Sequence, residues 1–198
     1  MLNDQVPLHE EERIEKLAVN IFSDIESITK DKIGISRESY GRGENQGINY
    51  IIDLADKYGL YVEQDEAANV ILSIDKSIKT NYILIGSHMD SVPQGGNFDG
   101  LAGVVAGFLI LANLKEKKIK TPLPVKVLIL RGEESAWYGK NCIGSKALFG
   151  LLSLEDLNST HRTTGEKLSK AMDASGANLN LIKKSKPLIN SQKIEIFI

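Results

Sequence analysis

Three residues able to do acid–base chemistry follow one apolar stretch in the middle of the chain. In the segment YILIGSHMDSVPQGGNFDG, residues 82–100, His88 and Asp90 come directly after the apolar run, and Asp99 lies eleven residues beyond His88. That separation does not place His88 and Asp99 on one helix face, so a glycine-containing loop must fold back to join them. Imidazole and carboxylate are the ligands that zinc, manganese and similar divalent ions take in proteins.

A pair of carboxylates follows a second apolar stretch. Glu133 and Glu134 come after the run Val125–Leu130 and the turn-forming Gly132. Because consecutive strand residues point to opposite faces of a sheet, both glutamates must lie past the strand end if they serve one site. One of them can then hold a metal ion while the other takes a proton from a water molecule that the metal activates.

Each of these residues also has an ordinary structural explanation. A single histidine after a strand is more often a structural side chain, an aspartate before a helix is usually an N-cap, and paired glutamates are usually surface charge. Four carboxylates and one imidazole at one rim of a sheet repel one another unless cations neutralise them. The occurrence of all five at strand or helix ends therefore favours a site for two divalent ions.

The elements that must position these residues indicate an α/β fold. We expect a three-layer, mostly parallel mixed sheet with helices on both faces, in which residues 82–87 and 125–130 are neighbouring central strands. Carboxyl ends of neighbouring parallel strands share one rim, which brings the two motifs together. The other expected elements are helices over residues 10–28, 48–58, 99–115, 145–149, 153–157 and 165–174, strands over residues 60–63, 69–74 and 193–198, and polar connections over residues 30–45 and 183–191.

Composition narrows the class of protein. The chain has 198 residues and a net charge of −2, which argues against nucleic acid or an anionic membrane as the main partner. Its one cysteine, Cys142, cannot form an internal disulfide, and the polar amino terminus lacks the pattern of a signal peptide. We therefore expect a cytoplasmic protein, with no apolar run long enough to cross a bilayer.

The two motifs together resemble the hydantoinase/carbamoylase family of amidases. They read GSHMDSVPQGGNFDGLAGVVAG and RGEESAWYGKNCIGSKALFG, and weaker similarity runs through GISRESYGRGENQG and DEAANVI. The family includes N-carbamoyl-L-amino-acid hydrolases, β-ureidopropionases and allantoate amidohydrolases, within a superfamily of di-metal aminoacylases and carboxypeptidases. The resemblance implies a di-zinc peptidase-like catalytic domain. It also implies a metal-dependent hydrolase that cleaves non-peptide carbon–nitrogen bonds in linear amides or ureides, through metal-activated water and a glutamate general base.

The resemblance also assigns roles to the five residues. It implies His88 as a ligand of one metal ion, Asp99 as the ligand that bridges both, and Glu134 as a ligand of the second. Glu133 matches the general base, and Asp90 matches the catalytic-site residue that orients the histidine. The implied cofactors are two divalent ions, zinc, manganese or similar, and the complete enzyme is expected to be a homodimer. The peptide bond after Asp99 is expected to be cis.

The chain departs from the family in two respects. Trp137 and Tyr138 stand where the family usually carries Arg-Phe. Family members are considerably longer, with two further metal-binding histidines and an inserted lid and dimerisation domain. His9 and His161 do not match those histidines, and we expect both at the surface. The 198 residues are therefore interpreted as the amino-terminal part of the catalytic domain, and we expect this chain alone to be inactive.

Two alternatives to an amidase stay open on the sequence. The first is a non-catalytic, truncated product that binds metal weakly, which metal content would distinguish. The second is a di-metal aminopeptidase, which shares the ligand set but cleaves peptide bonds. A substrate panel of N-carbamoyl amino acids, ureides and dipeptides would separate this second alternative from an amidase.

Overall fold

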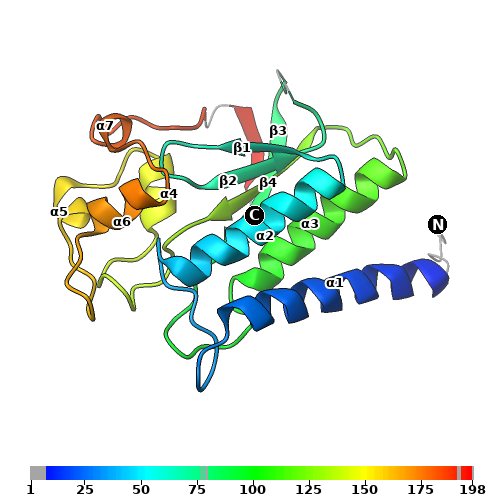
Figure 1. Cartoon of the computed structure of the whole chain (residues 1–198). Helices are drawn as coiled ribbons and strands as arrows, with labels where there is room; N and C mark the ends of the chain where they lie inside the picture. The colour runs from blue at the N-terminus through cyan, green and yellow to red at the C-terminus, as the bar shows by residue number, and fades with distance from the viewer. Residues whose placement is uncertain (1–7, 77, 79, 191–192, 198) are drawn as a thin grey trace.

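A five-stranded mixed sheet forms the centre of the molecule (Figure 1). The computed structural model describes residues 8–76, 78, 80–190 and 193–197. In spatial order the strands are β1 (Tyr61–Gln64), β2 (Val70–Ser73), β4 (Val125–Leu130), β3 (Tyr82–His88) and β5 (Ile194–Phe197). β3 is parallel to both β4 and β5, whereas β2 is antiparallel to β1 and β4, so β2 alone among these five runs against the others. The predicted α/β fold with a mostly parallel mixed sheet is confirmed.

The pairing of β3 with β4 sets the place of the site. Their register runs from Ile83 opposite Val125 to His88 opposite Leu130, so both strands reach the same rim together. The chain leaves β4 directly beside His88. Gly86 allows the two strands to lie at this distance, because a Cβ there would be 2.2 Å from the carbonyl oxygen of Leu128. The predicted adjacency and common direction of the two strands are confirmed.

Three long helices cover one face of the sheet (Figure 1). They are α1 (Leu8–Thr29), α2 (Arg42–Lys57) and α3 (Leu101–Glu116). α3 packs directly on β3 and β4, and a Cβ at Gly107 would lie 2.7 Å from the side chain of Val127. The main hydrophobic core lies between these helices and the sheet, and it contains fully buried residues such as Phe108, Leu111 and Ile51.

Shorter elements pack on the opposite face of the sheet. Tyr82, Leu84 and Leu128 there pack with Leu148 of α4, together with the segment 188–189. The short helices are α4 (Ile143–Leu148), α5 (Leu154–Leu157), α6 (Leu168–Ala174) and α7 (Leu179–Ile182). They gather beside the carboxyl end of β4 around a second core of their own (Figure 1). The predicted helices on both faces are therefore unequal, with the long ones on one side.

Two parts of the secondary structure differ from expectation. α2 begins at Arg42, although residues 42–45 were expected in a polar connection. Gly43 and Glu44 of this turn of helix are buried, and a Cβ at Gly43 would lie 2.3 Å from the carbonyl oxygen of Ser36. α7 was not expected. It begins after Asn178, whose side chain accepts a hydrogen bond from the backbone N–H of Leu181. Residue 198 of the last predicted strand lies outside the described residues.

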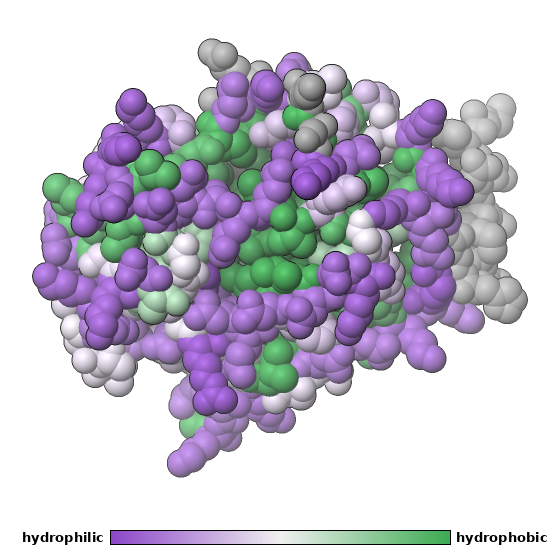
Figure 2. All heavy atoms as spheres, turned by 45° about the horizontal axis from the view of Figure 1, so that its top comes forward, coloured by the Kyte–Doolittle hydropathy of each residue, from purple (hydrophilic) through white to green (hydrophobic). Residues whose placement is uncertain are grey.

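The surface viewed in Figure 2 is hydrophilic over most of its area, with an apolar region near the centre that polar side chains border. α1 has 22 residues but carries acidic and basic side chains along its length. Within the described part of the chain, no helix is both long and apolar enough to cross a membrane.

Candidate metal centre

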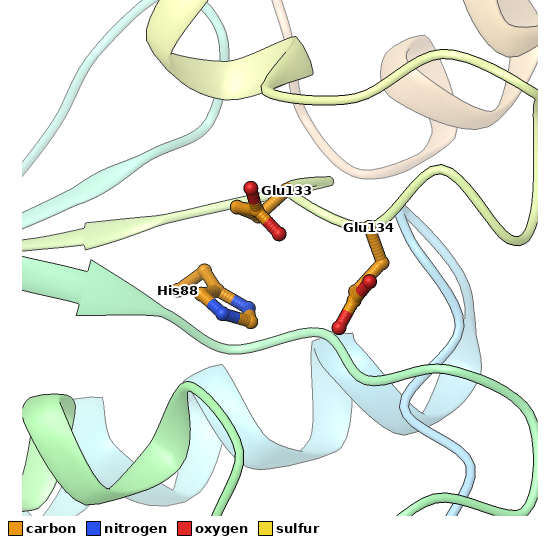
Figure 3. A group of neighbouring side chains, drawn as sticks. All are labelled: His88, Glu133 and Glu134. Carbon is orange, nitrogen blue, oxygen red and sulfur yellow. The ribbon is translucent and has the colours of Figure 1, made fainter.

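The carboxyl ends of β3 and β4 bring the predicted residues together. His88 ends β3, Glu133 and Glu134 lie in the loop after β4, and the three side chains face a common gap (Figure 3). One possible ligand atom from each lies within 4.8 Å of the others. Asp99 reaches the same place from the loop before α3, where its Oδ1 is 4.0 Å from Nε2 of His88.

Asp99 does not serve as the cap of the helix that follows it. The N-cap of α3 is Gly100, and no side chain makes a capping hydrogen bond there. The described peptide bonds are all trans, so the expectation of a cis bond after Asp99 is wrong. The chain turns instead at Gly100, which has φ +65°, and a Cβ there would lie 2.5 Å from the backbone oxygen and the ring of His88.

Asp90 lies beneath the site and orients His88. The carboxylate is fully buried, and Nδ1 of His88 lies 3.2 Å from its Oδ1 and 3.0 Å from its backbone oxygen. Nδ1 therefore carries the proton, which leaves the lone pair of Nε2 directed toward Asp99. Burial alone would lower the pKa of His88, but the hydrogen bond and charge of Asp90 outweigh burial and raise that pKa.

The same carboxylate holds the loop that carries the two glutamates. Oδ1 of Asp90 accepts a hydrogen bond from the backbone N–H of Glu133, and Oδ2 accepts one from that of Glu134, both at 3.0 Å. The hydroxyl of Ser39 donates to Oδ2 at 2.6 Å. Burial would raise the pKa of Asp90, but the hydrogen bonds to it prevail and lower that pKa. Both glutamates lie past the end of β4, as predicted.

The charges at the rim fit a divalent cation. Burial, a hydrogen bond to Asp99 and the negative charge of Asp99 together raise the pKa of Glu134 to about 7. Two carboxyl groups this close repel each other when both are charged, and a bound cation would relieve that repulsion. With the imidazole of His88 beside them, the donor set is one that zinc or manganese accepts.

Arg37 is a residue of the site that sequence reasoning missed. The fully buried guanidinium donates to the backbone oxygens of Met89 at 2.7 Å and Asp99 at 2.9 Å, and so fastens both ends of the loop between them. Its backbone N–H also donates to Oγ of Ser91 at 3.0 Å. In the sequence, Arg37 lies in the stretch GISRESYGRGENQG, whose weaker similarity to the family is its only signal.

His161 does not join the site. His161 is buried, so the expectation that it lies at the surface is wrong. Its Nε2 lies 2.6 Å from Oε1 of Glu38, and its ring stacks on Trp137 with ring centroids 5.5 Å apart. The side chain of His9 lies outside the described residues. Trp137 itself donates from Nε1 to the backbone oxygen of Ser91 at 2.7 Å, which connects the loop after Glu134 to the loop after β3.

Comparison with known proteins agrees with this geometry. The model of Peptidase family M20/M25/M40 matches residues 84–179. An uncharacterized hydrolase of Haemophilus influenzae is 35% identical over 176 residues, which are 87% of this chain and 40% of the relative. An N-carbamoyl-L-amino acid amidohydrolase of Geobacillus stearothermophilus is 33% identical over 147 residues, 72% of this chain and 35% of the relative.

Solved structures give the same result. A hydantoinase/carbamoylase family amidase from Burkholderia ambifaria superimposes with a TM-score of 0.74 at 27% identity, over 82% of this chain and 40% of that one. The chain thus spans about two fifths of the length of these relatives. The predicted resemblance is confirmed: over these residues the chain is similar to hydantoinase/carbamoylase family amidases and to proteins of Peptidase family M20/M25/M40.

Proposed function

We propose that this chain supplies metal-binding and proton-transfer residues of a hydrolase that cleaves the carbon–nitrogen bond of an N-carbamoyl amino acid or a related ureide. The observation that supports the proposal most is the convergence of His88, Asp99, Glu133 and Glu134 at the rim shared by β3 and β4. The substrate class follows relatives named N-carbamoyl-L-amino acid amidohydrolase and allantoate amidohydrolase, which are 33% and 30% identical to the chain.

Three residues are proposed as metal ligands. His88 would bind through Nε2, because Nδ1 is engaged with Asp90, and Glu134 would bind from the opposite side of the gap. Asp99, whose carboxyl interacts with Glu134 and lies 4.0 Å from Nε2 of His88, would be the ligand that two ions share. A bound divalent cation supplies Lewis-acid chemistry, which polarises the scissile carbonyl group and acidifies water.

Glu133 is proposed as the general base. Its backbone is held by Asp90, and its Oε1 lies 3.4 Å from Sγ of Cys142, so the carboxylate stays beside the proposed ligands without an ion-pair partner among the described residues. From there it can take a proton from the attacking water and return it to the nitrogen of the leaving group. Asp90 keeps His88 in the tautomer that leaves Nε2 free.

The ligand set of this chain is incomplete for two ions. The 198 residues hold three histidines, of which the structure brings His88 alone among the described side chains to the rim. Since ligand number and geometry determine affinity, we propose that this chain alone binds metal weakly and is inactive toward amides. The homodimer expected of the complete enzyme stays a prediction.

Two variants test the roles of ligand and base. Asp99→Ala should lose bound Mn²⁺ or Zn²⁺ because it removes the shared ligand, whereas Glu133→Ala should keep the metal content of the wild type. Metal would be measured by plasma emission spectroscopy after equilibrium dialysis, with Asp173→Ala, an exposed acid of α6, as the control. The same samples would be assayed on N-carbamoyl amino acids, allantoate and dipeptides. Equal metal loss in both site variants would contradict the assigned roles, and clear turnover by the wild-type chain would refute its incompleteness.

A further inference from the structure

The loop that carries the two glutamates is held by side chains from three distant segments. Each of its four backbone N–H groups, from residue 131 to 134, donates to a side-chain oxygen. Arg131 donates to Oδ1 of Asn69 at 3.1 Å, and Gly132 donates to Oε1 of Glu44 at 2.9 Å. Glu133 and Glu134 donate to the two carboxylate oxygens of Asp90, both at 3.0 Å. On the other side of the loop, the backbone oxygens of Arg131, Gly132 and Glu133 accept hydrogen bonds from the backbone N–H groups of residues 144, 143 and 142, at 2.9, 2.8 and 2.9 Å. The side-chain acceptors therefore hold the loop together with the start of α4.

Glu44 is the charged acceptor that the proposed chemistry does not use. It lies in the first turn of α2 and is fully buried. Besides Gly132, it accepts hydrogen bonds at Oε2 from Nε of Arg131 at 2.7 Å and from the backbone N–H of Tyr40 at 2.8 Å. All three donors converge on one carboxylate, which thereby joins α2 to the end of β4.

Burial of the Glu44 carboxylate disfavours its charged form. Burial outweighs the attraction of Arg131 and raises the pKa of Glu44 to about 7. A buried ion pair is often no more stabilising than well-packed apolar residues, so stability alone is a poor explanation for it. What an apolar side chain could not supply is an acceptor at a fixed place for the N–H of Gly132.

The hydrogen bond from Gly132 falls where the loop changes direction. Gly132 has φ +58°, a left-handed conformation that lets the chain turn out of β4 toward the site. Arg131, just before it, is also held on its other side, because its guanidinium lies 4.8 Å from the ring of Tyr40 and contacts Oδ1 of Asn45. Glu44 thus fixes Arg131 and Gly132, the two residues that directly precede Glu133 in the loop.

We propose that Glu44 is a positioning residue whose carboxylate, through Gly132 and Arg131, sets the distance between the two glutamates and His88. The inference rests on the proposed function, since it gives Glu44 a role toward the proposed ligand Glu134 and base Glu133. Asp90 fixes the loop to the end of β3, and the backbone of residues 142–144 fixes it to the start of α4. Glu44 adds the anchor to α2 that holds Gly132.

Two variants of Glu44 test this inference. Glu44→Ala removes all three acceptor contacts, and Glu44→Gln keeps the volume and one oxygen but presents an amide group to the remaining donors. The control is Ile51→Ala, a fully buried residue of the same helix that contacts the main core. All three substitutions should destabilise the chain, so comparisons are made at temperatures equally far below each Tm.

The first measurement is hydrogen exchange of the metal-free chain, read by mass spectrometry on a peptide that spans residues 131–136. We expect exchange there to be at least about tenfold faster in Glu44→Ala than in Ile51→Ala, with a smaller increase in Glu44→Gln. Fluorescence quenching of Trp137, the one tryptophan of the chain, should increase in the same order because it lies three residues beyond Glu134.

The second measurement is the affinity for Mn²⁺, which we expect to fall by about 10- to 100-fold in Glu44→Ala and to change little in Ile51→Ala. Loop exchange in both Glu44 variants no faster than in Ile51→Ala would overturn the inference. If Glu44→Ala fails to fold, Glu44→Gln decides by the same readings. Failure of the wild type to bind Mn²⁺ would refute the proposed metal site, whereas the exchange data on metal-free protein would still decide the role of Glu44.

Discussion

Asp90→Asn tests most directly whether Asp90 joins His88, at the end of β3, to the loop that carries Glu133 and Glu134. The side chain keeps its shape but loses its charge, and an NH₂ group replaces one oxygen. In the wild type, Oδ1 accepts a hydrogen bond from the backbone N–H of Glu133 at 3.0 Å and lies 3.2 Å from Nδ1 of His88. Oδ2 accepts hydrogen bonds from the backbone N–H of Glu134 at 3.0 Å and from the hydroxyl of Ser39 at 2.6 Å. Whichever oxygen is replaced, the new NH₂ group faces a backbone donor.

The size of the effect follows from those contacts. A buried backbone N–H left without an acceptor costs about 1–3 kcal/mol, and hydrogen bonds to a charged group are stronger than those to a neutral amide. We therefore expect the free energy of unfolding to fall by about 2–4 kcal/mol. Loss of the partner that orients a metal-binding histidine typically weakens metal binding by about 10- to 100-fold, and we expect that for Mn²⁺ here.

The assay combines urea unfolding at neutral pH with a calorimetric Mn²⁺ titration. The matched control is Asp156→Asn, because Asp156 also accepts hydrogen bonds from backbone and hydroxyl groups but does so at the start of α5, away from the rim. The control should lose about 1 kcal/mol of stability and keep the wild-type metal affinity. An Asp90→Asn protein with unfolding free energy and Mn²⁺ affinity like those of the wild type would refute the reasoning.

Two further predictions concern stability. Burial raises the pKa of Asp65 to about 6 from an ordinary value of 3.8, so the folded chain binds this proton more tightly than the unfolded chain. The resulting contribution to stability is complete below pH 3.8 and is lost as the pH rises through about 6. Relative to Asp65→Asn, the wild type should thus lose up to about 3 kcal/mol in urea unfolding between pH 4 and 7, and parallel pH profiles would contradict this. Gly86→Ala should destabilise by about 3 kcal/mol or more because its Cβ would meet the carbonyl oxygen of Leu128 at 2.2 Å, and an unchanged urea midpoint would count against that contact.

The parts of the fold that local patterns determine could be predicted from the sequence. β3 and β4 are short apolar runs that end in polar, turn-forming residues, and their predicted pairing and direction are confirmed. His88 and Glu134 could be predicted to lie at one rim because the carboxyl ends of neighbouring parallel strands lie at the same edge of a sheet. Their convergence needed no knowledge of distant contacts.

The residues that hold the site in place could not be predicted in this way. Arg37 and Glu44 belong to the stretch 30–45 that the sequence predicts to be a polar connection, yet both side chains are fully buried. Their burial depends on partners 52 to 88 residues away along the chain, such as Met89 and Gly132, which no local pattern reveals. The same holds for His161, whose burial depends on Trp137 and Glu38.

The most direct test of the account is an anomalous diffraction map from crystals of the chain soaked in Mn²⁺. The account predicts anomalous density at this rim in which one ion contacts Nε2 of His88, another contacts Glu134, Asp99 contacts both, and Glu133 is bonded to neither. No peak at this rim at saturating Mn²⁺, or a peak bonded to Glu133 in place of Asp99, would contradict the account.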